Sequence, residues 1–154
     1  MKIFFRQKYK YQLQLSPEQA EKKLLYITTR RFEDYSIDVV GSFDDGKFEL
    51  MNKWGLTDTA LIENRRAYLE GSLKAHGSDT FLEITLRPNI VFVISFYISL
   101  FLLLCELSSV SLIPIFSSGI KIICLASFNL LLLAVMILSV NELKKRFERL
   151  MQLD

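Results

Sequence analysis

The sequence predicts an α+β protein in which a small antiparallel β-sheet domain with one packed helix is followed by a transmembrane α-helical hairpin. Three observations support this prediction. Two long apolar segments lie late in the chain, several shorter segments before them alternate with period two, and one capped helix interrupts the alternation. We expect a cytoplasmic α+β domain (1–89), a two-helix hairpin (90–140) and a basic amphipathic C-terminal tail (141–154).

The apolar segments run from Ile90 to Phe116 and from Ile120 to Val140, with only Ser117, Ser118 and Gly119 between them. Each segment is long enough for the roughly 20 residues that a helix needs to cross a bilayer. Backbone N–H and C=O groups in lipid must pair within the segment, so helix is the expected conformation. The pattern therefore predicts two antiparallel membrane helices joined by a tight turn.

The segment from Lys2 to Leu15 places apolar or aromatic side chains at nearly every second position, which is typical of a half-buried strand. Ser16-Pro17-Glu18-Gln19 then supplies an N-cap, a proline at the first helical position and a capping-box glutamine. A helix to about Thr29 is expected. Three apolar residues form a stripe that can lie on a sheet: Ala20, Leu24 and Ile27.

Two hairpins are predicted next. Ser36–Phe43 and Lys47–Trp54 are joined through an Asp-Asp-Gly turn, and Asp-Gly between alternating segments is a strong hairpin signal. Arg66–Ala75 and Thr80–Arg87 repeat this plan around a His-Gly-Ser-Asp turn. Pro88 ends the last strand because proline cannot donate to the strand ladder, so the first membrane helix is expected to begin without a flexible linker.

The flanking charges predict that both chain ends lie in the cytoplasm. Arg87 precedes the first apolar segment and four basic residues follow the second, whereas the connecting region contains only Lys121. The start of the chain lacks the apolar core of a secretory signal, and we expect a multi-pass protein of the bacterial inner membrane. The four basic residues of the tail are also predicted to contact lipid headgroups: Lys144, Lys145, Arg146 and Arg149.

A polar pair is predicted inside the membrane. Glu106 lies 12 positions before Ser118 and Asn129 lies 11 after it, so in a continuous hairpin both side chains fall about 17 Å from the turn. An ionised carboxylate is costly at that depth, so Glu106 is expected to pair with Asn129. A helix break near Pro114 is the alternative, since it would shift the register and undo this depth match. Lys121 is expected to extend its ammonium to the interface. Three serines continue a polar stripe along the first helix: Ser95, Ser99 and Ser109.

The composition argues against an enzyme. The one histidine, His76, lies in a predicted turn, and both cysteines lie in apolar segments, so no set of side chains matches common zinc sites or nucleophile systems. Cys105 and Cys124 differ in predicted depth by about 10 Å, which disfavours a disulfide. Before Ile90, 14 basic residues face 13 acidic ones, which gives no basic face for nucleic acid. We expect no catalytic residue, no cofactor and no metal.

Three short segments precede the predicted hairpin: Gly41-Ser42-Phe43, Leu69-Glu70-Gly71-Ser72-Leu73 and Thr80-Phe81-Leu82-Glu83-Ile84. In this layout the chain resembles small uncharacterised bacterial membrane proteins that have a cytoplasmic β-rich domain and a two-helix hairpin. The domain is also similar in outline to helix-grip ligand-binding folds. Those folds are defined by shape, so the resemblance implies no binding residue.

Three functional hypotheses remain open. The first is a non-enzymatic integral membrane protein whose cytoplasmic domain binds a partner or scaffolds a membrane complex. The second is a sensor or carrier of a small molecule or lipid that uses a cleft between sheet and helix. The third is a transport-associated subunit that uses Glu106. The expected partners are membrane lipid and either another protein or a second copy of the chain.

Overall fold

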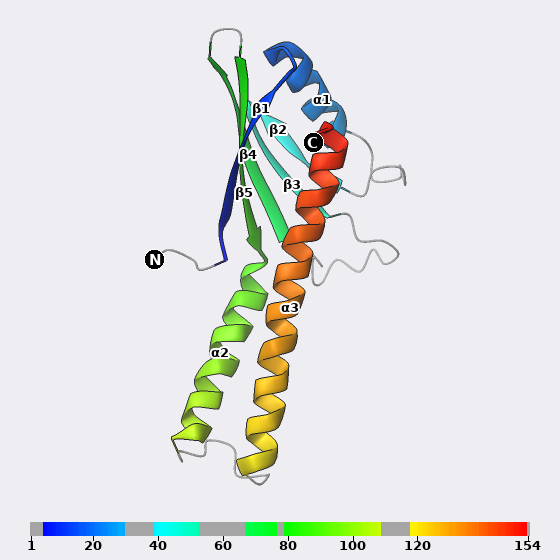
Figure 1. Ribbon diagram of the computed structural model, residues 1–154. Coiled ribbons are helices and arrows are strands. Elements are labelled where there is room, and N and C mark those ends of the chain that lie inside the picture. Colours follow the sequence, from blue (N-terminus) through cyan, green and yellow to red (C-terminus); the bar gives the residue numbers. More distant parts are fainter. Residues whose placement is uncertain (1–4, 30–38, 53–66, 77–78, 109–117, 154) are drawn as a thin grey trace. The chain divides into compact units, whose positions relative to one another are not determined.

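The computed structural model describes residues 5–29, 39–52, 67–76, 79–108 and 118–153 (Figure 1). This part of the chain contains β1 (Gln7–Leu13), α1 (Pro17–Thr29), β2 (Val39–Asp44), β3 (Lys47–Asn52), β4 (Ala67–His76), β5 (Asp79–Pro88), α2 (Ile90–Leu107) and α3 (Ser118–Met151). The chain forms two compact units. We call Met1–Pro88 with Ser139–Asp154 the sheet domain, and Asn89–Leu138 the hairpin unit. The predicted fold class is confirmed.

The five strands form one antiparallel sheet in the order β1-β5-β4-β3-β2. Consecutive strands from β2 to β5 are neighbours, whereas β1 pairs with the last strand, β5. The chain must therefore pass from one edge of the sheet to the other between β1 and β2, and α1 lies in this connection. The predicted apolar stripe of α1 is confirmed, since all three of its residues are buried: Ala20, Leu24 and Ile27.

Local sequence signals start α1 and join β2 to β3 as predicted. Ser16 Oγ accepts a hydrogen bond from the Gln19 amide, and Gln19 Oε1 accepts one from the Ser16 amide, both at 3.3 Å. These reciprocal bonds make the capping box. Between the strands, Asp45 and Gly46 have φ values of 44° and 71°. Two central residues in the left-handed region are what a two-residue hairpin turn requires.

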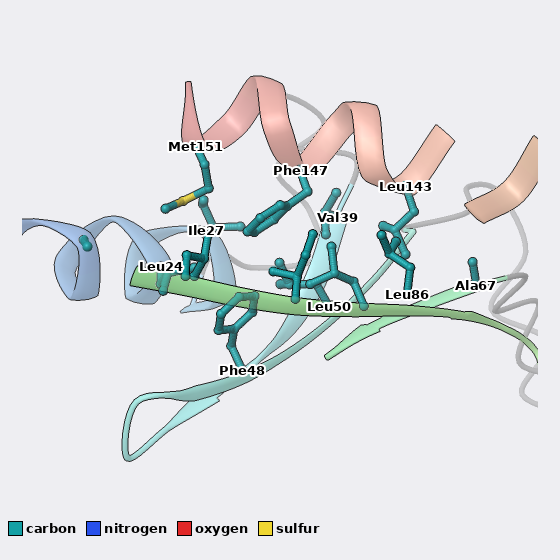
Figure 2. Close-up of a cluster of buried hydrophobic side chains, with 14 of the residues drawn as sticks. Leu24, Ile27, Val39, Phe48, Leu50, Ala67, Leu86, Leu143, Phe147 and Met151 are labelled. Atoms are coloured by element: carbon teal, nitrogen blue, oxygen red, sulfur yellow. The ribbon is translucent and has the colours of Figure 1, made fainter. Parts of the chain in front are cut away.

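A second helix closes the core of the sheet domain, where only one was predicted. The C-terminal part of α3 packs on the same sheet face as α1, with three fully buried side chains: Leu143, Phe147 and Met151 (Figure 2). The Phe147 ring stacks on Phe48 with centroids 5.7 Å apart. Five strands span roughly 20 Å and a helix covers about 10 Å, so one helix cannot cover this face. The predicted separate tail, 141–154, instead contributes to the domain core.

The C-terminus of α3 is capped by its own backbone and by α1. The Leu153 amide donates to Glu148 O at 2.9 Å, and the Gln152 amide donates to Arg149 O at 3.2 Å. Together with the φ of 58° at Gln152, this is a Schellman motif. Lys23 of α1 donates to Met151 O and to Gln152 Oε1, both at 3.1 Å. A cation at the C-terminal end also offsets the helix dipole.

Replacing Gln152 with glycine should make the protein more stable than replacing it with alanine, by about 1 kcal/mol, because glycine adopts a positive φ without steric cost. Both substitutions remove the contact between Gln152 Oε1 and Lys23, so their difference isolates the backbone effect. Urea unfolding of the purified variants in detergent measures this difference. Equal stability of the two variants would contradict the left-handed conformation at this position.

Thr80 places a hydroxyl in the core of the sheet domain. Its side chain is fully buried opposite Leu13 of β1, and Oγ1 has no hydrogen-bond partner among the described residues. A buried polar group without a partner is destabilising, so Thr80→Val should raise the free energy of unfolding by about 1 kcal/mol. Thr85→Val, on the half-buried opposite face of β5, is the control and should change stability little. A loss of stability in Thr80→Val would indicate a partner for the hydroxyl.

Candidate functional site

Two helices are long and apolar enough to cross a membrane, judged by length and composition: Ile90–Leu107 and Gly119–Met151. The first lies in the hairpin unit, and the second begins there and continues into the sheet domain. α2 begins directly after β5, with Asn89 as its N-cap. Asn89 Oδ1 accepts a hydrogen bond from the Val91 amide at 2.9 Å. The connection from the last strand to the first apolar helix is therefore one residue long, and that residue satisfies an otherwise unpaired amide of the first turn.

A buried ion pair joins the two helices. Lys121 Nζ lies 3.0 Å from Glu106 Oε1, and only 7% and 4% of the two side chains are exposed. Glu106 is the penultimate residue of α2, and Lys121 lies in the first turn of α3. These are the only two Asp, Glu, Lys or Arg residues between Arg87 and Glu142. The hairpin unit thus brings its two opposite charges together.

A second polar contact lies two helical turns away. Asn129 Nδ2 donates to Ser99 Oγ at 3.0 Å and to Leu125 O at 2.8 Å, and both polar side chains are buried. Ser99 precedes Glu106 by seven residues, and Asn129 follows Lys121 by eight. Asn129 Oδ1 has no hydrogen-bond partner among the described residues. The two contacts together define how α2 and α3 are aligned.

The predicted pairing of Glu106 with Asn129 is wrong, because each side chain has a different partner on the facing helix. The prediction assumed an unbroken helix from Ile90 to Phe116, but α2 ends at Leu107. Ending the helix early moves Glu106 to the helix terminus, where it meets the start of α3. The prediction for Lys121 is wrong for the same reason, since its ammonium is buried against a carboxylate.

The structure describes only part of the predicted polar stripe on α2. Ser99 and Glu106 are buried and Ser95 is half-buried. Ser109 lies outside the described residues. Both cysteines, Cys105 and Cys124, are free thiols.

The basic residues of the tail have different surroundings. Lys144 Nζ lies 4.0 Å from the Tyr9 ring centroid and 3.5 Å from Glu148 Oε1, so this side chain packs against the sheet domain. Arg146 pairs with Glu142. Lys145 and Arg149 are exposed. Lys144 and Glu148 flank the buried face of α3, and the predicted headgroup contact of Lys144 stays a prediction.

The contact between β1 and α3 is polar at its edge. The Tyr11 hydroxyl donates to Glu148 Oε1 at 2.7 Å. Burial raises the pKa of Tyr11 above its usual value, and the hydrogen bond to the Glu148 carboxylate raises it further. Tyr9 and Tyr11 also stack, with ring centroids 6.4 Å apart. These tyrosines hold β1 against α3.

The sheet face opposite the helices carries a hollow of about 490 Å³, lined mainly by polar side chains of four strands: Ser42, Asp44, Lys47, Glu49, Glu70, Ser72, Glu83 and Thr85. Glu83 pairs with Lys10 at 2.6 Å and with Lys74 at 2.7 Å. Hydrogen bonds from these two ammonium groups lower the pKa of Glu83 to about 2. Arg87 pairs with Glu70 and lies over the Tyr68 ring. Charges on this face are thus largely matched in pairs.

The predictions missed Lys121 as the partner of Glu106 and Ser99 as the partner of Asn129. One signal for the first pair was available, since two lone opposite charges in a long apolar region favour pairing. Within the described residues, no group of three or more His, Cys, Asp or Glu side chains could hold a metal ion. Comparison of the chain with protein-family models, curated proteins and solved structures gives no match.

Proposed function

We propose that this chain is a non-enzymatic integral membrane protein that crosses the bilayer twice and holds a partner-binding sheet domain at the cytoplasmic face. The observation that carries the proposal is that segments before and after the hairpin unit together build the sheet domain. Leu86 before the hairpin unit and Leu143 after it belong to one hydrophobic core. A chain that leaves this domain at Asn89 and returns at Ser139 crosses a bilayer an even number of times, which agrees with two candidate spans.

Surface composition supports the membrane assignment. Among the described residues, all exposed large apolar side chains except Leu25 and Tyr26 belong to the hairpin unit. Only 17% and 22% of the most apolar windows of its two helices are buried. A core helix of a soluble protein would be mostly buried, whereas lipid is a suitable environment for outward apolar side chains. The hairpin unit therefore fits a bilayer better than water.

The charge distribution supports a cytoplasmic sheet domain. Arg87 precedes the hairpin unit, and Lys145 and Arg149 are exposed after it. At the connecting end the single cation, Lys121, is paired with Glu106. This asymmetry agrees with the tendency of basic residues to remain in the cytoplasm. Lys145 and Arg149 are also the residues that we propose contact anionic headgroups.

The partner-binding role rests on the surface of α1. Leu25 and Tyr26 are adjacent and 46% and 52% exposed, and they point away from the buried stripe of the same helix. Among the described residues, these are the exposed large apolar side chains of the sheet domain, and we propose that they contact the partner. The alternative of a ligand cleft is less favoured, since Phe48 and Phe147 stack between the sheet and α3. The ion pair of Glu106 with Lys121 favours a structural role for Glu106 over a role in transport.

Cysteine labelling tests the topology. In a Cys105→Ser, Cys124→Ser background, Gly119→Cys reports the connecting end and Lys145→Cys reports the sheet domain. Gly119 is exposed, and a Cβ there would meet nothing within 4 Å. A membrane-impermeant maleimide added to intact cells should label Gly119→Cys alone, and both variants after permeabilisation. Labelling of Lys145→Cys from outside would refute the orientation, and release of the protein by carbonate washing would refute membrane integration.

Native mass spectrometry after gentle detergent extraction tests the partner. We expect a stoichiometric second protein or a second copy in the wild-type preparation. A Leu25→Ser, Tyr26→Ser variant should lose it while keeping the same melting temperature. Lys22→Ser, also exposed on α1, serves as the control and should retain the partner. A preparation that contains only monomer and lipid would refute the partner-binding role.

A further inference from the structure

The arrangement of the Glu106–Lys121 pair is unfavourable for the helices that carry it. Glu106 lies in the last turn of α2, where the helix dipole is negative, and Lys121 lies in the first turn of α3, where it is positive. Each charge therefore occupies the helix end that repels it. The opposite assignment of the two charges would suit both dipoles, so helix stability does not explain this arrangement.

Burial adds a second constraint. Both side chains are more than nine-tenths buried, and Lys121 Nζ lies 3.0 Å from Glu106 Oε1. A buried charge that loses its partner is strongly destabilising, whereas a matched pair presents no net charge. Lone Lys or Glu side chains are also costly for insertion into a bilayer. The free-energy cost of inserting either charge into a bilayer is thus lowered by the presence of the other charge.

We propose that Glu106 and Lys121 cross the bilayer as an ion pair, so that the connecting end of the hairpin has no net charge during the crossing. This inference rests on the proposed two-span topology and explains why two charged residues in the connecting end do not prevent the crossing. Charge neutralisation is the property that matters, so the sign on each helix is interchangeable. The Asn129–Ser99 contact aligns the same two helices but contributes no charge.

The Gly119→Cys reporter in the cysteine-free background tests this inference, with external labelling taken to completion so that local thiol reactivity does not matter. Glu106→Gln and Lys121→Gln each leave the hairpin unit with one charge that no opposite charge neutralises. The ratio of externally labelled to unlabelled protein should fall on the order of ten-fold in each single variant, as expected for a lone charge in an inserting segment. The double Gln variant and the exchange Glu106→Lys, Lys121→Glu should label like wild type.

Asn129→Leu is the matched control, because it removes the second polar contact without changing charge, and it should leave labelling unchanged. Carbonate-resistant protein is measured for each variant to separate failed crossing from failed membrane targeting. Wild-type labelling of either single variant would overturn the inference, and so would failure of the double or exchanged variant. If the unaltered reporter is not labelled from outside, the proposed topology fails instead, before the pair is tested.

Discussion

Replacing Phe147 with alanine should lower the free energy of unfolding of the sheet domain by about 3–5 kcal/mol. The side chain is fully buried and stacks on Phe48, with ring centroids 5.7 Å apart. Its neighbours on α3 and the sheet cannot close the space left by a ring that is held between two rigid elements. Hydrogen exchange of the β4 and β5 amides in increasing urea measures the loss in the purified protein.

Lys145→Ala is the control on the exposed face of the same helix and should change stability by less than about 0.5 kcal/mol. A loss below about 1 kcal/mol in Phe147→Ala would mean that the C-terminal part of α3 does not belong to the core of the sheet domain, since large core truncations cost more. That result would also remove the main support for a hairpin that leaves and returns on one side.

Replacing Gly41 with alanine should cost about 3 kcal/mol or more, at the upper end of the range for overpacking. A Cβ at this position would lie 1.9 Å from Glu49 O and 2.7 Å from Leu50 Cδ2. Gly41 is paired with Leu50 in the β2–β3 ladder, so the carbonyl can move only if the ladder opens. Faster hydrogen exchange in β2 and β3, together with a lower urea midpoint, is the expected result.

Two other glycines provide graded controls. A Cβ on Gly71 would lie 2.2 Å from the Phe48 ring, which is a side chain and can turn, so Gly71→Ala should cost less than Gly41→Ala. A Cβ on Gly119 would meet nothing within 4 Å, and alanine favours helix there, so Gly119→Ala should be neutral or stabilising. An equal effect at Gly41 and Gly119 would contradict the strand pairing.

Local sequence signals were sufficient for most of the fold. The alternation of β1, the capping box at Ser16 and the turn at Asp45 and Gly46 each depend on residues that are neighbours in the chain. Backbone geometry and periodicity act over a few residues, so these elements could be predicted without knowledge of the rest. The two apolar segments were identified in the same way, from length and composition alone.

The candidate site was predicted less well, because its geometry depends on where a helix ends. Counting residues from Ser118 gave Glu106 the depth of Asn129 only while α2 was assumed to be continuous. Three serines and Pro114 follow Leu107 within seven residues, so a helix break was one possible interpretation, but the sequence alone does not set where the helix ends. Once the helix ends there, Glu106 faces Lys121, and Asn129 faces Ser99.

The sequence alone determined the kinds of element in this protein, their order, and the amphipathic pattern of the C-terminal segment. Tertiary structure decided the strand order, the pairing of Glu106 with Lys121 and the packing of Phe147 on the sheet. The physical reason is that an apolar helix face indicates only that something must cover it. Lipid, α1 or the sheet could each cover the apolar face of the C-terminal part of α3. The sheet covers it because α1 leaves part of the five-stranded sheet uncovered.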